Sequence, residues 1–237
     1  MPSENSIRSW FDRLYAQKQL NSMRRIEAYP VYLDYLEVVQ DKKLLDVGCG
    51  PGLLLKAAQG RGLKTYGFDL SPQAIILASR TSPESHLQIG SVTQIQHPDK
   101  KFDYVTCIGV LEHFLDMDKS IAELRRIAKN NCRYCIMVPN SQTLYWKFSE
   151  RFSRSHKESN ENARSLREWG DFFATHGFKI IKIYRDDWQI RKLFMILGLG
   201  AFPKLVEFTK KILWKLIPLS YAHQFIFILE KNENAST

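Results

Sequence analysis

Between residues 43 and 140, short apolar runs alternate with stretches in which apolar residues recur every three to four positions. The short runs are typical of buried strands, and the longer spacing is typical of helices. The predicted strands are 44–47, 65–69, 87–89, 102–108 and 134–138. The predicted helices are 53–59, one that starts at Ser71-Pro72, and 118–128. Strands and helices that alternate in this way indicate an α/β fold with a parallel sheet covered on both faces.

The flanking regions follow other patterns. Residues 7–39 have the apolar spacing of helices, and 166–176 is an aromatic-rich helix closed by Gly177. Two further strands, 178–184 and 224–229, are separated by 188–218, which is much longer than a hairpin needs and is therefore an insertion. We expect one domain over 1–237, with N-terminal helices in 1–40, a core in 41–140, a helical region in 141–177, the last strands in 178–230 and a tail in 231–237.

Composition agrees with one globular domain. The chain has 237 residues, of which 44% are hydrophobic and 25% charged, which excludes a mainly disordered protein. The longest uncharged apolar run, 193–203, is much shorter than the roughly 20 residues that a membrane-spanning helix needs. The N-terminus is polar and has no apolar secretory segment, so we expect a cytoplasmic protein.

The four cysteines do not form a disulfide framework in a chain of this length. Cys132 and Cys135 have the spacing of half a metal site, but they lie in a predicted strand, where residues three apart point to opposite faces. No second pair completes a tetrahedral zinc set. We therefore expect core cysteines and no metal.

The glycine-rich turn after the first strand carries the strongest chemical signal. It reads Asp46-Val47-Gly48-Cys49-Gly50-Pro51-Gly52, or D-x-G-x-G-x-G. Glycines at every second position let the backbone turn sharply and approach a ligand closely, and a helix predicted to begin near Pro51 directs N–H groups to the same space. The dinucleotide pattern G-x-G-x-x-G fails because its third glycine would be Leu53 or Leu55, and no Walker A Gly-Lys-Ser/Thr follows.

An acidic residue ends the second strand. Asp69 lies seventeen residues after Gly52, where a carboxylate is placed to accept hydrogen bonds from both hydroxyls of an unphosphorylated ribose. A tight turn and a surface acid are the alternative explanation, and either feature alone would be a weak signal. Together, the turn and Asp69 predict a nucleoside ligand at the carboxyl ends of the strands.

Residues 43–140 resemble the class I S-adenosylmethionine-dependent methyltransferases, and 178–229 match them in layout only. The segments Thr106-Cys107-Ile108-Gly109-Val110-Leu111-Glu112-His113-Phe114 and Val138-Pro139-Asn140 look most like the ubiquinone-biosynthesis-type small-molecule members. The resemblance implies a doubly wound, mostly parallel, seven-stranded Rossmann-like sheet whose last strand runs antiparallel. It also implies S-adenosyl-L-methionine as the cofactor, bound by the core.

The resemblance assigns roles to individual residues. Glycines of the turn contact the methionine and ribose side, Asp69 contacts the ribose, and residues around Gly90 line the adenine. The predicted contact set is Asp46, Gly48, Cys49, Gly50, Gly52, Asp69, Leu70, Ser91, Val92, Cys107 and Ile108. Two positions depart from the family: Ser91 stands where an acid usually accepts from the adenine amino group, and Gly109 stands where metal-using quinone methyltransferases carry a glutamate. Both departures weaken the corresponding adenine and metal contacts.

Methyl transfer from a sulfonium mainly requires alignment of the reactants, and a base is needed only if the acceptor must lose a proton. His113 is the candidate catalytic base because it follows the fourth strand and has a near-neutral pKa when unperturbed. Alternatively, Glu112 and His113 simply begin the next helix.

The insertion 188–218 carries six lysines and arginines against Glu207 alone. One helical face holds Leu205, Phe208, Ile212 and Leu216, the opposite face holds Lys204, Glu207, Lys211 and Lys215, and Trp214 lies near the boundary. This pattern is typical of a helix in a membrane interface, and basic residues favour an anionic leaflet. It is equally compatible with a lid over the active site.

We therefore expect methyl transfer to a small molecule, with a lipid-like or membrane-borne acceptor favoured and peripheral attachment at the inner membrane face. A formal net charge of +9 suggests RNA methylation as one alternative, but 138–141 lacks the Asn/Asp-Pro-Pro-aromatic pattern of adenine amino methylation, and no RNA-binding module is appended. A non-catalytic module that binds the cofactor is another, against which the intact glycines and Asp69 argue.

Overall fold

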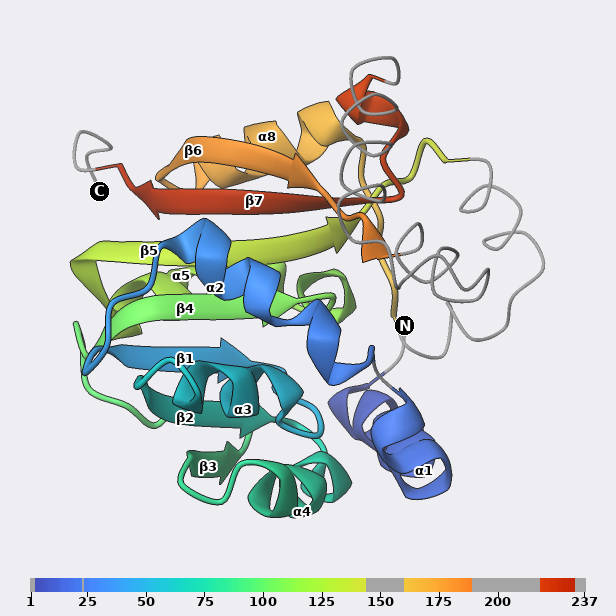
Figure 1. The fold of residues 1–237 in the computed structure, drawn as a ribbon. Helices are drawn as coiled ribbons and strands as arrows, with labels where there is room; N and C mark the ends of the chain where they lie inside the picture. Colours follow the sequence, from blue (N-terminus) through green and yellow to red (C-terminus); the bar gives the residue numbers. More distant parts are fainter. Residues whose placement is uncertain (1–2, 23, 144–159, 189–217, 233–237) are drawn as a thin grey trace, which may run out of the picture.

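The computed structural model describes residues 3–22, 24–143, 160–188 and 218–232. Its centre is a seven-stranded sheet in the order β3-β2-β1-β4-β5-β7-β6 (Figure 1). The strands are β1 (Lys43–Val47), β2 (Lys64–Asp69), β3 (His86–Ile89), β4 (Phe102–Ile108), β5 (Ala128–Pro139), β6 (Phe178–Arg185) and β7 (Gln224–Lys231). Strands β1 to β5 pair in parallel, and β7 is antiparallel to both β5 and β6. The expected doubly wound, mostly parallel sheet is confirmed.

Helices cover both faces of the sheet. They are α1 (Glu4–Lys18), α2 (Pro30–Leu36), α3 (Leu53–Gln59), α4 (Pro72–Thr81), α5 (Met117–Ile127) and α8 (Leu166–Thr175), with short 3-10 turns η1 (Gln19–Ser22), η2 (Ile26–Ala28), η3 (Leu111–His113) and η5 (Leu219–Tyr221). One apolar core joins the sheet to α2, α3 and α4, and a second joins the opposite face to α5 and α8. Helix α1 belongs to neither layer and lies across the carboxyl ends of the strands beside α4 (Figure 1).

The cysteines lie in these two cores. All four are buried free thiols. Cys132 packs in the core of α5 and α8, whereas Cys135 packs in the core of α2 and α3. The prediction that this pair points to opposite faces of a strand is therefore confirmed, and both residues contribute apolar packing.

Local signals in the sequence account for several helix ends. The Ser71 hydroxyl accepts a hydrogen bond from the Ala74 N–H at 3.1 Å, and Pro72 occupies the first helical position of α4. Ser165 and Glu168 form a capping box at the start of α8, and Gly177 follows that helix with φ +71°. These caps fix where the chain enters and leaves the sheet.

Two of the predicted boundaries differ in the structure. Residues 7–39 form α1, two 3-10 turns and α2, and α1 ends where Gln19 adopts φ +46°. Strand β5 begins at Ala128, because residues before Tyr134 still pair with β4 and β7. Helix α3 spans Leu53–Gln59 as predicted, and Gly52, which has φ +78°, directly precedes it. Most of the predicted insertion, 189–217, lies outside the described residues.

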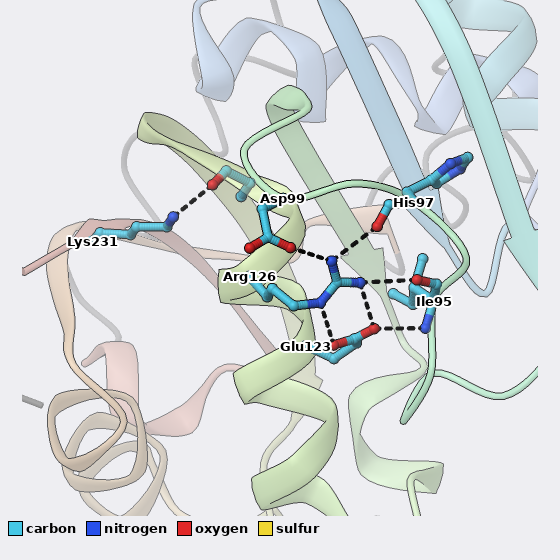
Figure 2. A network of polar contacts seen from close by, with 7 residues as sticks. Ile95, His97, Asp99, Glu123, Arg126 and Lys231 are labelled. Carbon is cyan, nitrogen blue, oxygen red and sulfur yellow. Dashed lines mark hydrogen bonds and ion pairs between the residues drawn. The ribbon is translucent and has the colours of Figure 1, made fainter.

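The loop between β3 and β4 is held by a single arginine on α5. Figure 2 shows the Arg126 guanidinium at the centre of this contact. It donates to Glu123, at 2.7 and 2.8 Å, to Asp99, and to the carbonyl oxygens of Ile95 and His97, both at 2.9 Å. The amide N–H of Ile95 donates in turn to Glu123. Arg126 thereby anchors a loop whose first residues, Gly90 to Thr93, reach the site described next.

Candidate cofactor site

A cavity of about 410 Å³ lies between the carboxyl ends of the central strands and α1. Its sheet-side wall includes residues at the ends of β1 and β2, the start of the loop after β3, and the segment after β4. Its other wall comes from α1, through Ile7, Phe11 and Tyr15 among others. The volume falls within the roughly 300–1,000 Å³ of pockets that bind small molecules and cofactors.

The glycine turn brings bare backbone to this cavity. Gly48, Gly50 and Gly52 have φ values of +68°, +49° and +78°, which lie in a backbone region that residues with a Cβ atom rarely adopt. A Cβ added to Gly48 would lie 2.5 Å from a methyl carbon of Val110. The backbone N–H groups of Gly48 and Cys49 both donate to the carbonyl oxygen of Phe68, at 2.7 and 3.0 Å. The turn is therefore fixed against β2 and leaves no room for a side chain at Gly48.

Asp69 connects the turn to the next helix. Its carboxylate accepts from the Gly50 N–H at 2.9 Å and from the Ser71 N–H at 2.8 Å. Burial raises the pKa of Asp69 to about 6, although both N–H donors act to lower it. At pH 7 the group is ionised and faces the cavity, where it can accept further hydrogen bonds.

Helix α1 forms the wall of the cavity that faces the sheet. Tyr15 is buried, and burial near Asp69 raises the pKa of its hydroxyl. The Phe11 and His113 rings meet edge to face with centroids 5.4 Å apart. The Asp12 carboxylate accepts from the Ser71 hydroxyl at 2.5 Å. These contacts attach α1 to the segments that follow β2 and β4.

Six of the predicted site residues line the cavity: Gly48, Asp69, Leu70, Ser91, Val92 and His113. The remaining six are not part of the cavity lining: Asp46, Cys49, Gly50, Gly52, Cys107 and Ile108. Cys49 and Cys107 are buried thiols with pKa values raised by burial. Asp46 accepts from the Thr106 hydroxyl at 2.7 Å, and burial raises its pKa to about 7. The predicted cofactor contacts of this second group stay predictions.

Glu112 and His113 sit at different depths although they are neighbours. They form the 3-10 turn η3 instead of starting α5, which begins at Met117. His113 faces the cavity, whereas Glu112 is 2% exposed and its Oε2 atom has no hydrogen-bond partner among the described residues. Burial raises the pKa of Glu112 to about 8, so this carboxyl group is mostly protonated at pH 7.

The described part of the chain contains neither a metal-binding cluster nor a membrane-spanning helix. No cluster of three or more His, Cys, Asp or Glu residues is arranged to hold a metal ion there. No helix there combines the length and apolar character required to cross a bilayer.

Comparison with known proteins identifies the domain. A family model described as a methyltransferase domain matches residues 45–136. The ubiquinone biosynthesis O-methyltransferase of Saccharophagus degradans is 32% identical over 126 residues, which cover 51% of this chain and 52% of that protein. Residues 45–136 therefore form a methyltransferase domain, and this part of the chain is similar to ubiquinone biosynthesis O-methyltransferases. It spans about half the length of the curated relatives that it matches.

Solved structures of low sequence identity share the fold of this methyltransferase domain. The methyltransferase solved with the Haloferax volcanii Trm112 methyltransferase activator has a TM-score of 0.71 and 14% identity, over 98% of this chain and 100% of that one. A Burkholderia thailandensis 1,6-didemethyltoxoflavin-N1-methyltransferase, solved with S-adenosylhomocysteine, has a TM-score of 0.64 and 14% identity, over 97% and 88%.

The site has features that suit S-adenosylmethionine, the cofactor that the sequence predicts. The cavity is of cofactor size, the backbone at Gly48 has no space for a side chain, and the Asp69 carboxylate faces the cavity at the end of β2. Leu70, Val92 and Phe114 add apolar surface suited to the faces of a purine.

Proposed function

We propose that the chain transfers a methyl group from S-adenosylmethionine to a small-molecule acceptor. The observation that carries this proposal is the pairing of the Gly48 turn with Asp69 in one cavity at the carboxyl edge of the sheet. The bound cofactor supplies a methyl group on a positively charged sulfur, which is a good leaving group. The chain's own residues then have to hold, orient and desolvate the reactants.

Asp69 and the glycine turn act together in this assignment. The Gly50 N–H fixes one oxygen of Asp69 and the Ser71 N–H fixes the other, so the carboxylate is aimed before any ligand binds. The apolar residues of α1 cover the opposite side and exclude water from the cavity. Such a preset arrangement reduces the ordering cost of binding.

Calorimetry tests the proposal directly. Titration with S-adenosylmethionine or S-adenosylhomocysteine should release heat and saturate at one site per chain, while NADH should not bind. No binding of either sulfur compound, together with binding of NADH, would refute the assignment.

We assign to His113 the role of a base for acceptors that must lose a proton. It lines the cavity after β4 and lies against Phe11. His113→Ala should lower turnover by about 10²–10⁴-fold while the dissociation constant of S-adenosylhomocysteine changes much less. Phe11→Leu is the matched control, because it removes the ring contact and keeps the imidazole. Unchanged turnover in His113→Ala would exclude the residue from the reaction.

We favour a lipid-like or membrane-borne acceptor. The support is the sequence of 188–218, where apolar and basic positions alternate with helical spacing. The protein should bind anionic phospholipid vesicles, and added salt should weaken this binding. Absence of binding at low salt would leave the insertion as a lid only.

The acceptor class is decided by label transfer. The protein is incubated with methyl-labelled cofactor and separate lipid, quinone and RNA fractions. Label in the lipid or quinone fraction supports the proposal, and label in RNA alone overturns the small-molecule assignment.

A further inference from the structure

The order of the strands locates the end of the cavity that would hold the adenine. From the methyl-transfer side at β4, the sheet runs through β1 and β2 to β3 at its edge. Asp69 ends β2, so a ribose held there places the base beyond it, over the loop that follows β3. The Gly90 N–H donates to the Asp69 carbonyl oxygen at 3.1 Å, which fixes the start of this loop. This step rests on the proposed function.

The polar groups at this end come from the loop and from α1. The Ser91 hydroxyl donates to Glu4 Oε2 at 2.6 Å and lies 2.9 Å from the Thr93 hydroxyl. All three residues line the cavity. The Ser91 hydroxyl donates its only proton to Glu4, so it cannot donate to a ligand at the same time. The Glu4 carboxylate has about four lone-pair sites and can therefore accept further hydrogen bonds.

The position of Glu4 is determined by the docking of α1. Ile7 is buried one turn further along the helix, and Asp12 accepts both from the Ser71 hydroxyl and from the Gln73 N–H. Ser3 caps the helix, so Glu4 stands in the first helical turn. The carboxylate is therefore supplied by a folded and attached element, 87 residues away in sequence from Ser91.

We propose that Glu4, held by Ser91, accepts a hydrogen bond from the exocyclic amino group of the cofactor's adenine. Helix α1 would thereby supply the acid that the end of β3 lacks at Ser91. Glu4 is a specificity residue in this assignment, and Ser91 is a positioning residue that acts through it. A charged acceptor strengthens a hydrogen bond relative to a neutral one, so the adenine should be distinguished from a purine without the amino group.

A double-mutant cycle between protein and ligand tests this contact. The ligands are S-adenosylhomocysteine and its 6-deamino analogue, in which purine replaces adenine. Calorimetry measures both dissociation constants for the full-length wild type, Glu4→Ala, Glu4→Gln and Ser91→Ala. Glu84→Ala is the matched control, because Glu84 is an exposed glutamate that does not line the cavity.

The wild type and Glu84→Ala should bind the adenine compound about tenfold more tightly than the deamino analogue. In Glu4→Ala this ratio should fall to within about twofold, and Glu4→Gln should keep an intermediate ratio because its amide oxygen still accepts. Ser91→Ala should reduce the ratio partly. An unchanged ratio in Glu4→Ala, including equal weakening of both ligands, would overturn the inference while the proposed function stands. If the wild type binds neither ligand, the proposed function fails, and the inference fails with it.

Discussion

Substitution of Gly48 by alanine tests the turn on which the cofactor site is built. The added Cβ would lie 2.5 and 2.6 Å from the two methyl carbons of Val110, and the residue would have to keep φ +68°. The left-handed conformation costs an alanine about 1–2 kcal/mol, and forced overlap in a packed region costs roughly 1–3 kcal/mol. Gly48→Ala should therefore lower the free energy of unfolding by about 2–5 kcal/mol.

Gly60→Ala is the matched control. Gly60 follows α3 with φ −61°, and the nearest atom to a new Cβ is a carbonyl oxygen at 3.4 Å. An alanine there has no strain and reduces the freedom of the unfolded chain, so stability should stay the same or rise by up to about 1 kcal/mol. Urea unfolding followed by circular dichroism measures both variants, and calorimetry with S-adenosylhomocysteine measures binding.

A second substitution separates the cost of the left-handed conformation from the cost of the overlap with Val110. Gly48→Ala combined with Val110→Ala removes both methyl carbons that the new Cβ would meet. The double variant should regain most of the stability lost to overlap, because only the Cβ of residue 110, at 3.0 Å, would remain close to the new methyl group. It should still lose the conformational cost of about 1–2 kcal/mol, so the effects of the two substitutions should be strongly non-additive. Equal stability of Gly48→Ala and Gly60→Ala would refute this reasoning, because the turn would then not be confined to its left-handed conformation.

Two further predictions concern the surroundings of the site. Arg126→Ala removes the donors to Ile95 and His97 and should lower the free energy of unfolding in urea by about 1–2 kcal/mol. Arg167→Ala, which breaks an exposed ion pair, should change it by less than about 0.5 kcal/mol. Equal losses in both variants would contradict the role of Arg126 in holding the loop between β3 and β4. Glu112 has a pKa raised from 4.5 to about 8, so its contribution to stability is complete below pH 4.5 and is lost as the pH rises through 8. Between pH 5.5 and pH 8, the wild type should lose roughly 3 kcal/mol of its free energy of unfolding through this group, and Glu112→Gln should not show that loss. If the wild type and Glu112→Gln lose the same amount between the two pH values, Glu112 is not protonated in the folded protein.

Elements with local signals could be predicted from the sequence. The apolar runs gave β1 and β4 nearly residue by residue, and Ser71-Pro72 gave the start of α4. Glycine spacing also predicted the turn after β1, because only glycine readily adopts three such φ values within five residues. In these cases the physical cause lies within a few residues of its effect.

The long-range contacts of the site had no such signal. The hydrogen bond from Ser91 to Glu4 joins segments 87 residues apart, and the spacing of α1 indicated only a helix with one apolar face. Likewise, the burial of Glu112 follows from the packing of η3, and in sequence it was indistinguishable from an acid at a helix start. Such contacts depend on how finished elements pack together.

Asp69 shows why fold and cofactor recognition cannot be separated in this chain. Its two oxygens hold the N–H groups of Gly50 and Ser71, so it joins the glycine turn after β1 to the segment that starts α4. The Leu70 backbone also hydrogen-bonds to Asp69, but a carboxylate has about four lone-pair sites, so the group can still accept a further hydrogen bond. Because burial raises its pKa only to about 6, the group is charged at neutral pH. Asp69 thus connects the two segments that form this side of the site, and it also provides the acceptor that a ribose requires.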